Sequence, residues 1–399
     1  MNVAKIREDF PIFQSQPKLI YFDNACMSLR PKQVIAAMNA YYEQYPACAG
    51  RSQHRLGRAA TEAYERARAR IAKFINAKPE EIIFTRNTTE GINLVARALP
   101  LGRGDVVLGT DKEHNSNLLP WLLAKERGIR HAICHSNPDN TFSMQNFENA
   151  LKADRPQLVA FVHASNLDGV TIPAQEIIKR AHDADALVLL DAAQSVPHQP
   201  IDVRKLGVDF LAFSGHKMLG PSGTGVLYVS RAVVERLGQF MIGGETVINS
   251  TYDSYQLDRP PARFEAGLQN YAGAIGLAAA ADYLEKVGLE GIHAHEVELT
   301  KALTDSISRI PGISIIGPSA ELRGGVTSFN LEKVDPHTIA IMLDELAGIA
   351  VRSGQHCVHS WFNAHGLKGS VRASLYLYNT AEEVAAFAET LQKIAKTLK

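Results

Sequence analysis

A lysine follows directly on an apolar stretch that has the pattern of a buried strand. Residues 210–213 read Phe-Leu-Ala-Phe, a polar turn with His216 and Lys217 comes next, and Gly220 and Pro221 then break the chain. An amine at the end of a buried strand loses hydration, which lowers its pKa and makes it nucleophilic. Such an amine forms a Schiff base with a carbonyl compound. An ordinary surface lysine after a strand is the alternative.

A second apolar stretch, 187–190, ends in the carboxylate of Asp191. An uninterrupted apolar stretch is typical of a strand buried on both faces of a parallel sheet, and ligands of such sheets bind beyond the carboxyl ends of the strands. An aspartate at that edge can keep a pyridine nitrogen protonated, so that pyridoxal phosphate (PLP) acts as an electron sink. Asp191 and Lys217 in this order predict a PLP site, whereas a helix-capping role for Asp191 is the alternative.

The elements that must position these side chains alternate between strand and helix patterns, which predicts a mostly parallel sheet. The junction at Thr88, Thr89 and Gly91 suits a phosphate, because free N–H groups and a helix dipole face an anion there. A simple threonine N-cap is the alternative. Strand patterns cover 19–22, 81–85, 105–109 and 158–163, and helical patterns cover 31–42, 61–75 and the stretch from 92 onward.

The composition is that of an enzyme with a large core. The chain has 399 residues, a formal net charge of +0 and 46% hydrophobic residues. Balanced charge argues against a nucleic-acid or membrane surface, and neither a signal peptide nor a membrane-spanning stretch is predicted. We expect a cytoplasmic protein with free thiols, because the four cysteines are widely spaced: Cys26, Cys48, Cys134 and Cys357.

The regular alternation of strand and helix patterns ends near residue 285. We therefore expect three parts: a PLP-binding large domain at 19–284, a small α+β domain at 285–399, and an N-terminal segment, 1–18, packed on the small domain. Within the small domain the patterns predict helices at 296–310 and 336–346 and strands at 325–331 and 349–354.

Six segments carry a resemblance to a known family: Thr88–Val95, Glu113–His114, Val188–Gln194, Phe213–Lys217, Arg263–Gly267 and Val351–Cys357. Over its whole length the chain resembles the class V aminotransferase group of PLP fold-type I, and most closely the SufS-type (group II) cysteine desulfurases. The resemblance implies an α/β fold with a mostly parallel seven-stranded sheet. It also implies a homodimer that converts L-cysteine to alanine and passes sulfur to an acceptor protein (SufE/SufU-like or a scaffold) for iron–sulfur cluster, thio-cofactor or tRNA synthesis.

The resemblance also assigns roles at the cofactor. Lys217 is expected to bind PLP covalently, Asp191 to pair with the ring nitrogen, and His114 to stack on the ring. Asn166 and Gln194 are expected to contact the ring oxygen. The residues expected at the phosphate are Thr88, Thr89, Ser214 and His216.

Cys357 stands in Arg352-Ser-Gly-Gln-His356-Cys357, which resembles the group II motif around the catalytic cysteine. A thiolate is the nucleophile, and neighbouring cations favour it, so Arg352 and His356 are expected contributors. A small buried cysteine is the alternative. Arg372 resembles the arginine that binds the substrate carboxylate, since a guanidinium matches that anion in two-point fashion. The other residues expected to bind substrate are Asn24, Arg51, His54 and Arg352.

The sequence departs from the family in several places. Val358 and His359 follow Cys357 where relatives commonly have an alanine. Leu268 follows Glu-Ala-Gly where many members have a threonine that contacts the phosphate of the neighbouring subunit. Cys26 and Cys48 occupy loops that carry small residues in relatives. We expect both loops to border the substrate entrance, and hypothesise that one thiol receives sulfur from Cys357 or that the pair binds a metal or cluster with it. Filling of small loop cavities is the alternative.

Three other functions are compatible with the motifs. A selenocysteine lyase or cyst(e)ine C–S lyase of the same fold ranks first among them. Such an enzyme releases the chalcogen without a stored persulfide. A transaminase or epimerase follows. A non-catalytic assembly partner that has kept the fold is disfavoured by the intact set of Lys217, Asp191, His114 and Arg372.

Overall fold

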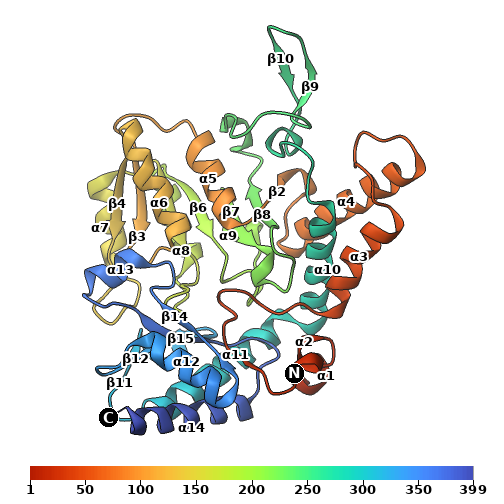
Figure 1. Cartoon of the computed structure of the whole chain (residues 1–399). Coiled ribbons are helices and arrows are strands. Elements are labelled where there is room, and N and C mark those ends of the chain that lie inside the picture. Colours follow the sequence, from red (N-terminus) through yellow and green to blue (C-terminus); the bar gives the residue numbers. More distant parts are fainter. Residues whose placement is uncertain (399) are drawn as a thin grey trace.

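The computed structural model describes residues 1–398 and contains one large sheet, drawn with its helices in Figure 1. Six of its seven strands run in one direction, because β8 is antiparallel to both of its neighbours while the remaining pairs are parallel. The predicted mostly parallel seven-stranded sheet is therefore confirmed. In spatial order the strands are β2 (Ile82–Thr85), β8 (Gly225–Val229), β7 (Phe210–Ser214), β6 (Leu187–Asp191), β5 (Leu158–Val162), β3 (Val106–Thr110) and β4 (Arg130–Cys134).

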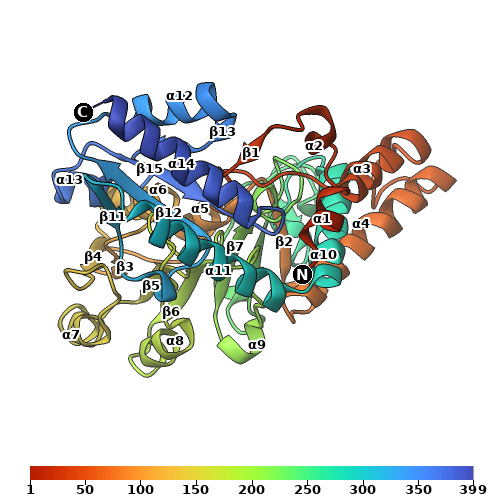
Figure 2. The same cartoon turned by 90° about the horizontal axis from the view of Figure 1, so that it is seen from below.

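Helices cover both faces of this sheet, which explains why its central strands are apolar on both sides. Figure 2 shows two of the helices, α7 and α8, below the sheet. One core lies beneath α5 (Thr88–Ala98) and α6 (Asn115–Leu123). The opposite core is formed with α4 (Arg55–Phe74), α7 (Met144–Asp154), α8 (Ala174–His182), α9 (Val203–Leu206) and α10 (Tyr271–Val287), and α3 (Lys32–Gln44) packs on α10.

A second, antiparallel sheet lies below the first in Figure 1 and has a separate apolar core. Its strands, in spatial order, are β11 (Ile313–Ile316), β12 (Val326–Leu331), β15 (Ser370–Ser374) and β14 (Arg352–Gly354). The helices of this region are α11 (Leu289–Ile307), α12 (Pro336–Ala347), α13 (His359–Ala364) and α14 (Ala381–Thr397). This region carries Arg352, Cys357 and Arg372.

The N-terminal segment packs against the end of the chain. Its helices are α1 (Val3–Arg7) and α2 (Ile12–Ser15), and β1 (Ile20–Tyr21) pairs in parallel with β13 (Ile349–Ala350). Arg7 forms an ion pair with Glu383 at 2.7 Å, and the ring of Phe10 contacts that of Tyr378 with centroids 4.8 Å apart. The loop after β1 is thereby brought to the edge of β15.

Two helices begin earlier than their patterns predict. The helix predicted at 61–75 begins at Arg55, because the imidazole of His54 caps it by accepting from the N–H of Gly57. The helix predicted at 296–310 begins at Leu289. The first turns of α11 also contact a core, because Ile292 is buried in the core of the large-sheet region.

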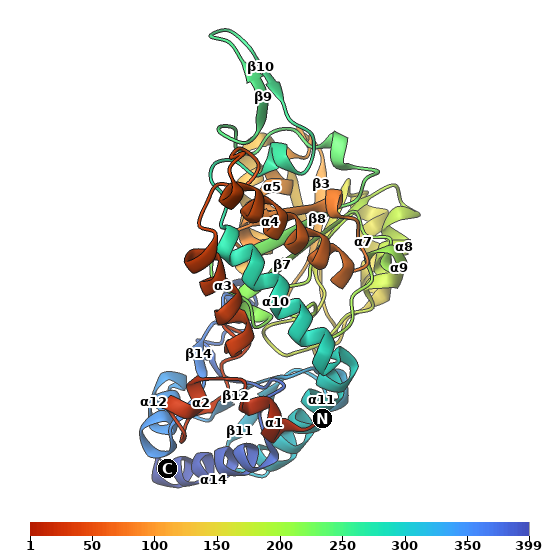
Figure 3. The same ribbon diagram turned by 90° about the vertical axis from the view of Figure 1, so that its right-hand side faces the viewer.

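A hairpin of β9 (Val247–Ser250) and β10 (Tyr255–Leu257) projects from the body of the molecule, as Figure 3 shows. The side chains of Ile248, Tyr252 and Tyr255 on it are exposed. The sequence patterns do not predict this hairpin, since its side chains cover no core of this chain.

A buried ion pair ties α4 to the large sheet and has a large expected effect on stability. Glu265 accepts from Arg68 at 2.7 and 2.9 Å, and also from Tyr64 Oη and the N–H of Phe84. Glu265→Ala leaves the buried guanidinium of Arg68 with only the exposed Glu65 as counter-charge, so we expect the free energy of unfolding to fall by roughly 3–5 kcal/mol. Urea denaturation measures this change. Glu62→Ala, which breaks an exposed pair with Arg66, is the control and should have little effect.

Candidate active site

A cavity of about 220 Å³ lies where the ends of the large-sheet strands meet the small sheet. It is lined by most of the residues that the sequence singles out, from both regions of the chain. From the set predicted at the cofactor and substrate these are Thr88, Thr89, His114, Asn166, Asp191, Gln194, Ser214, His216, Lys217, Arg352, Cys357 and Arg372. Cys26 and His356 line it as well, together with Asn87 and Ser116, which the sequence analysis did not identify.

Lys217 and Asp191 lie at the ends of neighbouring parallel strands. Asp191 is the last residue of β6, and Lys217 ends the short turn after β7. Burial lowers the pKa of Lys217 from its ordinary value, while Asp191 opposes this and Arg372 adds to it. Burial also raises the pKa of Asp191, which the charge of Lys217 and the N–H of Ala193 counteract. A desolvated amine beside a buried carboxylate is suited to nucleophilic and proton-transfer chemistry.

Hydroxyl groups gather at the first turn of α5. Ser214 Oγ accepts from the N–H of Thr88 at 2.9 Å and lies 2.7 Å from Thr88 Oγ1, and Thr89 Oγ1 lies 2.6 Å from Ser116 Oγ. Asn87 caps the helix by accepting from the N–H of Glu90. A helix start with hydroxyl groups at the cavity is suited to an anion, because the helix dipole and the hydroxyl donors both favour negative charge.

His114 is uncharged at neutral pH. Burial lowers its pKa to about 3, and the charges of Lys217 and Arg372 add to this effect. Nδ1 accepts from the N–H of Ser116 at 3.1 Å, so the proton of the neutral ring is on Nε2. The side chain caps α6 from the cavity wall.

The described residues fit PLP. The Nδ2 group of Asn166 donates to the carbonyl of His356 at 2.7 Å, which leaves the buried Oδ1 without a partner among them and free for the ring hydroxyl. Asp191 is placed for a protonated ring nitrogen, and the α5 start for the phosphate. Gln194 lines the cavity, although its Nε2 group donates to the carbonyl of Ala25.

Two arginines face each other across neighbouring strands of the small sheet. Arg352 on β14 is in register with Arg372 on β15. Asp23 lies between them, 3.5 Å from Arg372 and 4.0 Å from Arg352. One carboxylate cannot neutralise two guanidinium groups, and like charges directly opposite each other are destabilising. Because Nε of the buried Arg372 also has no partner among the described residues, the pair is suited to binding a further carboxylate.

Cys357 is exposed, in a loop whose backbone is strained. His356 and Cys357 have consecutive positive φ values of 49° and 59°, which cost energy in residues other than glycine. The N–H of Asn115 donates to the carbonyl of Cys357 at 2.7 Å and so joins this loop to the start of α6 beside His114.

The expectation that His356 acts as a cation near Cys357 is wrong. Burial lowers the pKa of His356 to about 2, with Arg372 and Arg352 adding to the effect, and its ring lies 2.8 Å from Ser370 Oγ. The neutral ring holds the loop on β15 and does not provide charge. Of the two contributors expected beside the thiol, only Arg352 is cationic.

Three residues predicted to bind substrate do not line the cavity. Asn24 is buried and donates to the carbonyl of Ser374 at 2.7 Å, so it fastens the loop after β1. Arg51 pairs with Glu245 at 2.6 Å, and His54 caps α4. The structure brings none of them to the cavity of the same chain.

The four cysteines are free and differ in position. Cys26 lines the cavity with Cys357, whereas the exposed Cys48 does not. Cys134 is buried, and burial raises the pKa of its thiol to about 12. In residues 1–398 no group of three histidine, cysteine or carboxylate side chains is arranged to hold a metal ion, so the expectation of a metal or cluster shared by these thiols is wrong.

Comparisons with family models, with curated proteins and with solved structures give consistent results. The family model described as aminotransferase class-V matches residues 20–387. A probable cysteine desulfurase of Methanothermobacter thermautotrophicus is 41% identical over 399 residues, which cover 99% of this chain and 98% of the relative. The apo structure of a cysteine desulfurase from Thermococcus onnurineus NA1 matches with a TM-score of 0.94 and 41% identity, covering 99% of this chain and 98% of that one.

A further solved structure is the cysteine desulfurase CsdA of Escherichia coli, in a form described as S-sulfonic acid. It matches with a TM-score of 0.91 and 31% identity, and the match covers 100% of this chain and 99% of that one. Among residues 1–398, no helix has the length and apolar character that crossing a membrane requires.

Proposed function

This chain belongs to the aminotransferase class-V family, and we propose that it is a PLP-dependent cysteine desulfurase that holds sulfur from L-cysteine as a persulfide on Cys357. The single observation that supports this most is the cavity that Cys357 shares with Lys217 and Arg372. An amine for PLP, a site for a carboxylate and a thiol are the three groups that the reaction needs. The motif from Arg352 to Cys357 favours group II desulfurases.

Arg372 is proposed to bind the carboxylate of L-cysteine, with Arg352 assisting from the neighbouring strand. Arg372 is buried and held in place by the carbonyl of Asn166 at 3.0 Å and by Asp23. Since its guanidinium group is already ordered, little further entropy is lost when it binds an anion. The substrate is thereby oriented with its Cα toward Lys217.

Lys217 is proposed to take the proton from the substrate Cα, because it is the amine at the cavity wall and its pKa is lowered by burial. Asp191 is proposed to pair with the ring nitrogen and His114 to contact the ring. Thr88, Thr89, Ser214 and His216 are the residues proposed at the phosphate. When bound, PLP withdraws electrons from the substrate Cα.

The thiolate of Cys357 is proposed to attack the sulfur of the substrate. A sulfur–sulfur bond forms and the Cβ–S bond breaks, with its electron pair remaining on carbon. Protonation of that carbon gives alanine, and the sulfur stays on Cys357. No external oxidant is required, because the sulfur is oxidised by the carbon that is reduced.

The acceptor of this sulfur is proposed to be a separate protein, since Cys357 is exposed at the surface of the small-sheet region. We also propose a homodimer. The exposed apolar side chains of the β9–β10 hairpin and of Leu268 favour a contact with a second copy.

Product analysis tests this proposal. With L-cysteine as substrate we expect alanine and a protein-bound persulfide in equal initial amounts, and added thiol reductant should convert the persulfide to sulfide. The measurements are chromatography of the amino acids and mass spectrometry of the protein. Pyruvate with ammonia would instead indicate a C–S lyase, and an exchanged keto acid a transaminase.

A further inference from the structure

The loop that carries Cys26 is fastened to both halves of the active site. On one side, the N–H of Ala25 donates to Ser374 Oγ at 2.9 Å, two residues beyond Arg372 on β15. On the other side, the N–H of Ser28 donates to the carbonyl of His216 at 2.9 Å, next to Lys217. Cys26 therefore has a fixed place at the cavity wall.

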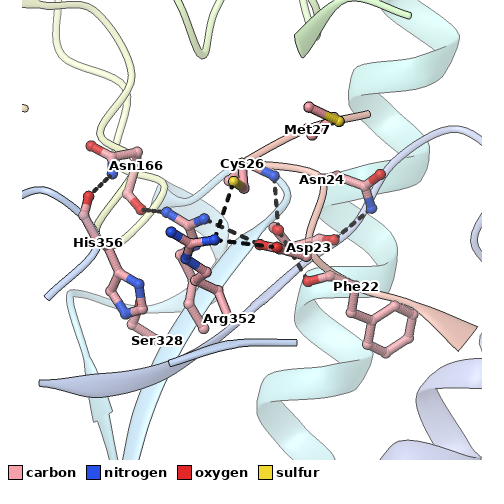
Figure 4. A network of polar contacts seen from close by, with 12 residues as sticks. Phe22, Asp23, Asn24, Cys26, Met27, Asn166, Ser328, Arg352 and His356 are labelled. Carbon is pink, nitrogen blue, oxygen red and sulfur yellow. Dashed lines mark hydrogen bonds and ion pairs between the residues drawn. The ribbon is translucent and has the colours of Figure 1, made fainter. Parts of the chain in front are cut away.

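The sulfur of Cys26 has a cationic partner. Arg352 donates from its guanidinium group to Cys26 Sγ at 3.4 Å, and Asp23 lies beside both, as Figure 4 shows. This hydrogen bond holds the sulfur at the cavity wall. Arg352 lines the cavity together with Cys26 and Cys357.

Two further observations favour chemistry at Cys26 over a packing role. The cavity contains buried polar atoms without partners among residues 1–398, at Arg372 Nε and Asn166 Oδ1, so it is built to receive a ligand. Cys26 is only partly buried, and it lines the same cavity as Lys217 and Cys357. A cysteine that merely fills a loop void faces apolar atoms instead.

We propose that Cys26 is a second sulfur-carrying site, which receives the outer sulfur of the Cys357 persulfide within the same cavity. This proposal rests on the proposed function, because it takes the Cys357 persulfide as its donor. The Cys26 thiolate attacks the outer sulfur and a new sulfur–sulfur bond forms on Cys26. The bond in the Cys357 persulfide breaks, and its electron pair leaves with the Cys357 sulfur, which becomes a thiolate.

The exchange consumes one thiolate and releases one, so it needs neither oxidant nor reductant. The exchange frees the exposed Cys357 for another substrate molecule, while the first sulfur stays on Cys26 beside Arg352. Cys48 is the matched comparison. It is a free thiol in a loop of the same region of the sequence, but it does not line the cavity.

The test locates the persulfide directly. The holoenzyme is mixed with L-cysteine in the absence of reductant and acceptor, quenched by alkylation, digested, and analysed by mass spectrometry. We expect persulfide on Cys357 and Cys26 and none on Cys48. In Cys357→Ser no persulfide should reach Cys26. In Cys26→Ser the persulfide should be confined to Cys357. The initial amount of alanine formed by Cys26→Ser should be about half that formed by Cys48→Ser, because one of the two sulfur-carrying sites is missing.

A second readout does not depend on turnover. In the protein without PLP, Arg352→Gln should slow alkylation of Cys26 and leave alkylation of Cys48 unchanged. Two results would overturn this proposal and leave the proposed function intact: persulfide on Cys357 alone in wild-type protein, or a Cys26–Cys357 disulfide with release of sulfide. Persulfide on Cys26 in Cys357→Ser would overturn both the proposal and the proposed function. Absence of persulfide from Cys357 in every variant would overturn both.

Discussion

Replacing Lys217 by alanine is expected to abolish the conversion of L-cysteine to alanine. The variant loses both the amine that binds PLP covalently and the base that takes the Cα proton. Proton transfer by a positioned side chain is alone worth about 10²- to 10⁴-fold in rate, so the loss should reach at least this range. Alanine formation, measured with saturating PLP, checks the rate. The visible absorption of the purified protein should also change, because the covalent link to PLP is gone.

The control for this change is Lys179→Ala, which removes an exposed lysine paired with Asp183 on α8. It should leave both alanine formation and the visible absorption as in wild-type protein. Alanine formation by Lys217→Ala at a rate near that of the control would contradict the assignment of Lys217. A wild-type protein that stays colourless after incubation with PLP would contradict the cofactor site as a whole.

The second large effect is expected for Cys357→Ser, with loss of desulfuration but retention of PLP. The side chain of Cys357 is exposed, and no hydrogen bond of its thiol is seen among residues 1–398, so the substitution should leave the fold intact. A serine hydroxyl is a poor nucleophile toward sulfur at neutral pH, and we expect the rate with L-cysteine to fall by about 10²-fold or more. Turnover of selenocysteine should persist in part, because selenide is the better leaving group.

Alanine formation with each substrate and the PLP absorption of the variant measure these effects. Cys48→Ser is the control, because it removes an exposed thiol that does not line the cavity. If Cys357→Ser consumed L-cysteine at the wild-type rate, the enzyme would be a lyase that needs no stored sulfur. Lys217→Ala and Cys357→Ser thus test the cofactor site and the sulfur-carrying residue independently.

Local sequence patterns were enough to predict that Lys217 and Asp191 lie near the ends of neighbouring strands. Lys217 and Asp191 follow apolar stretches that must be buried strands, and parallel strands end at one edge of their sheet. The junction at Thr88 and Thr89 could be predicted because a strand followed by a helix start is a local arrangement. The motif around Cys357 was recognisable from its resemblance to a family, although the patterns do not show which residues it meets.

Contacts between distant parts of the chain decided the substrate side. Arg352 and Arg372 face each other only because β14 and β15 pair in register, and Asp23 reaches them because the loop after β1 is bonded to β15. The same contacts put Cys26 in the cavity and leave Cys48 outside it. A loop has no periodicity of its own, so its place depends on partners far away in sequence.

The charge state of a side chain was also a tertiary property. His356 beside Cys357 suggests a cation in the sequence, yet burial, with the charges of Arg372 and Arg352 adding to it, lowers the pKa of His356 to about 2 and makes the ring neutral. Residue type and spacing therefore determined which chemical groups this protein has and which strand ends carry them. Only the packed structure decided which of them meet and which are charged, because desolvation and long-range pairing depend on the whole fold.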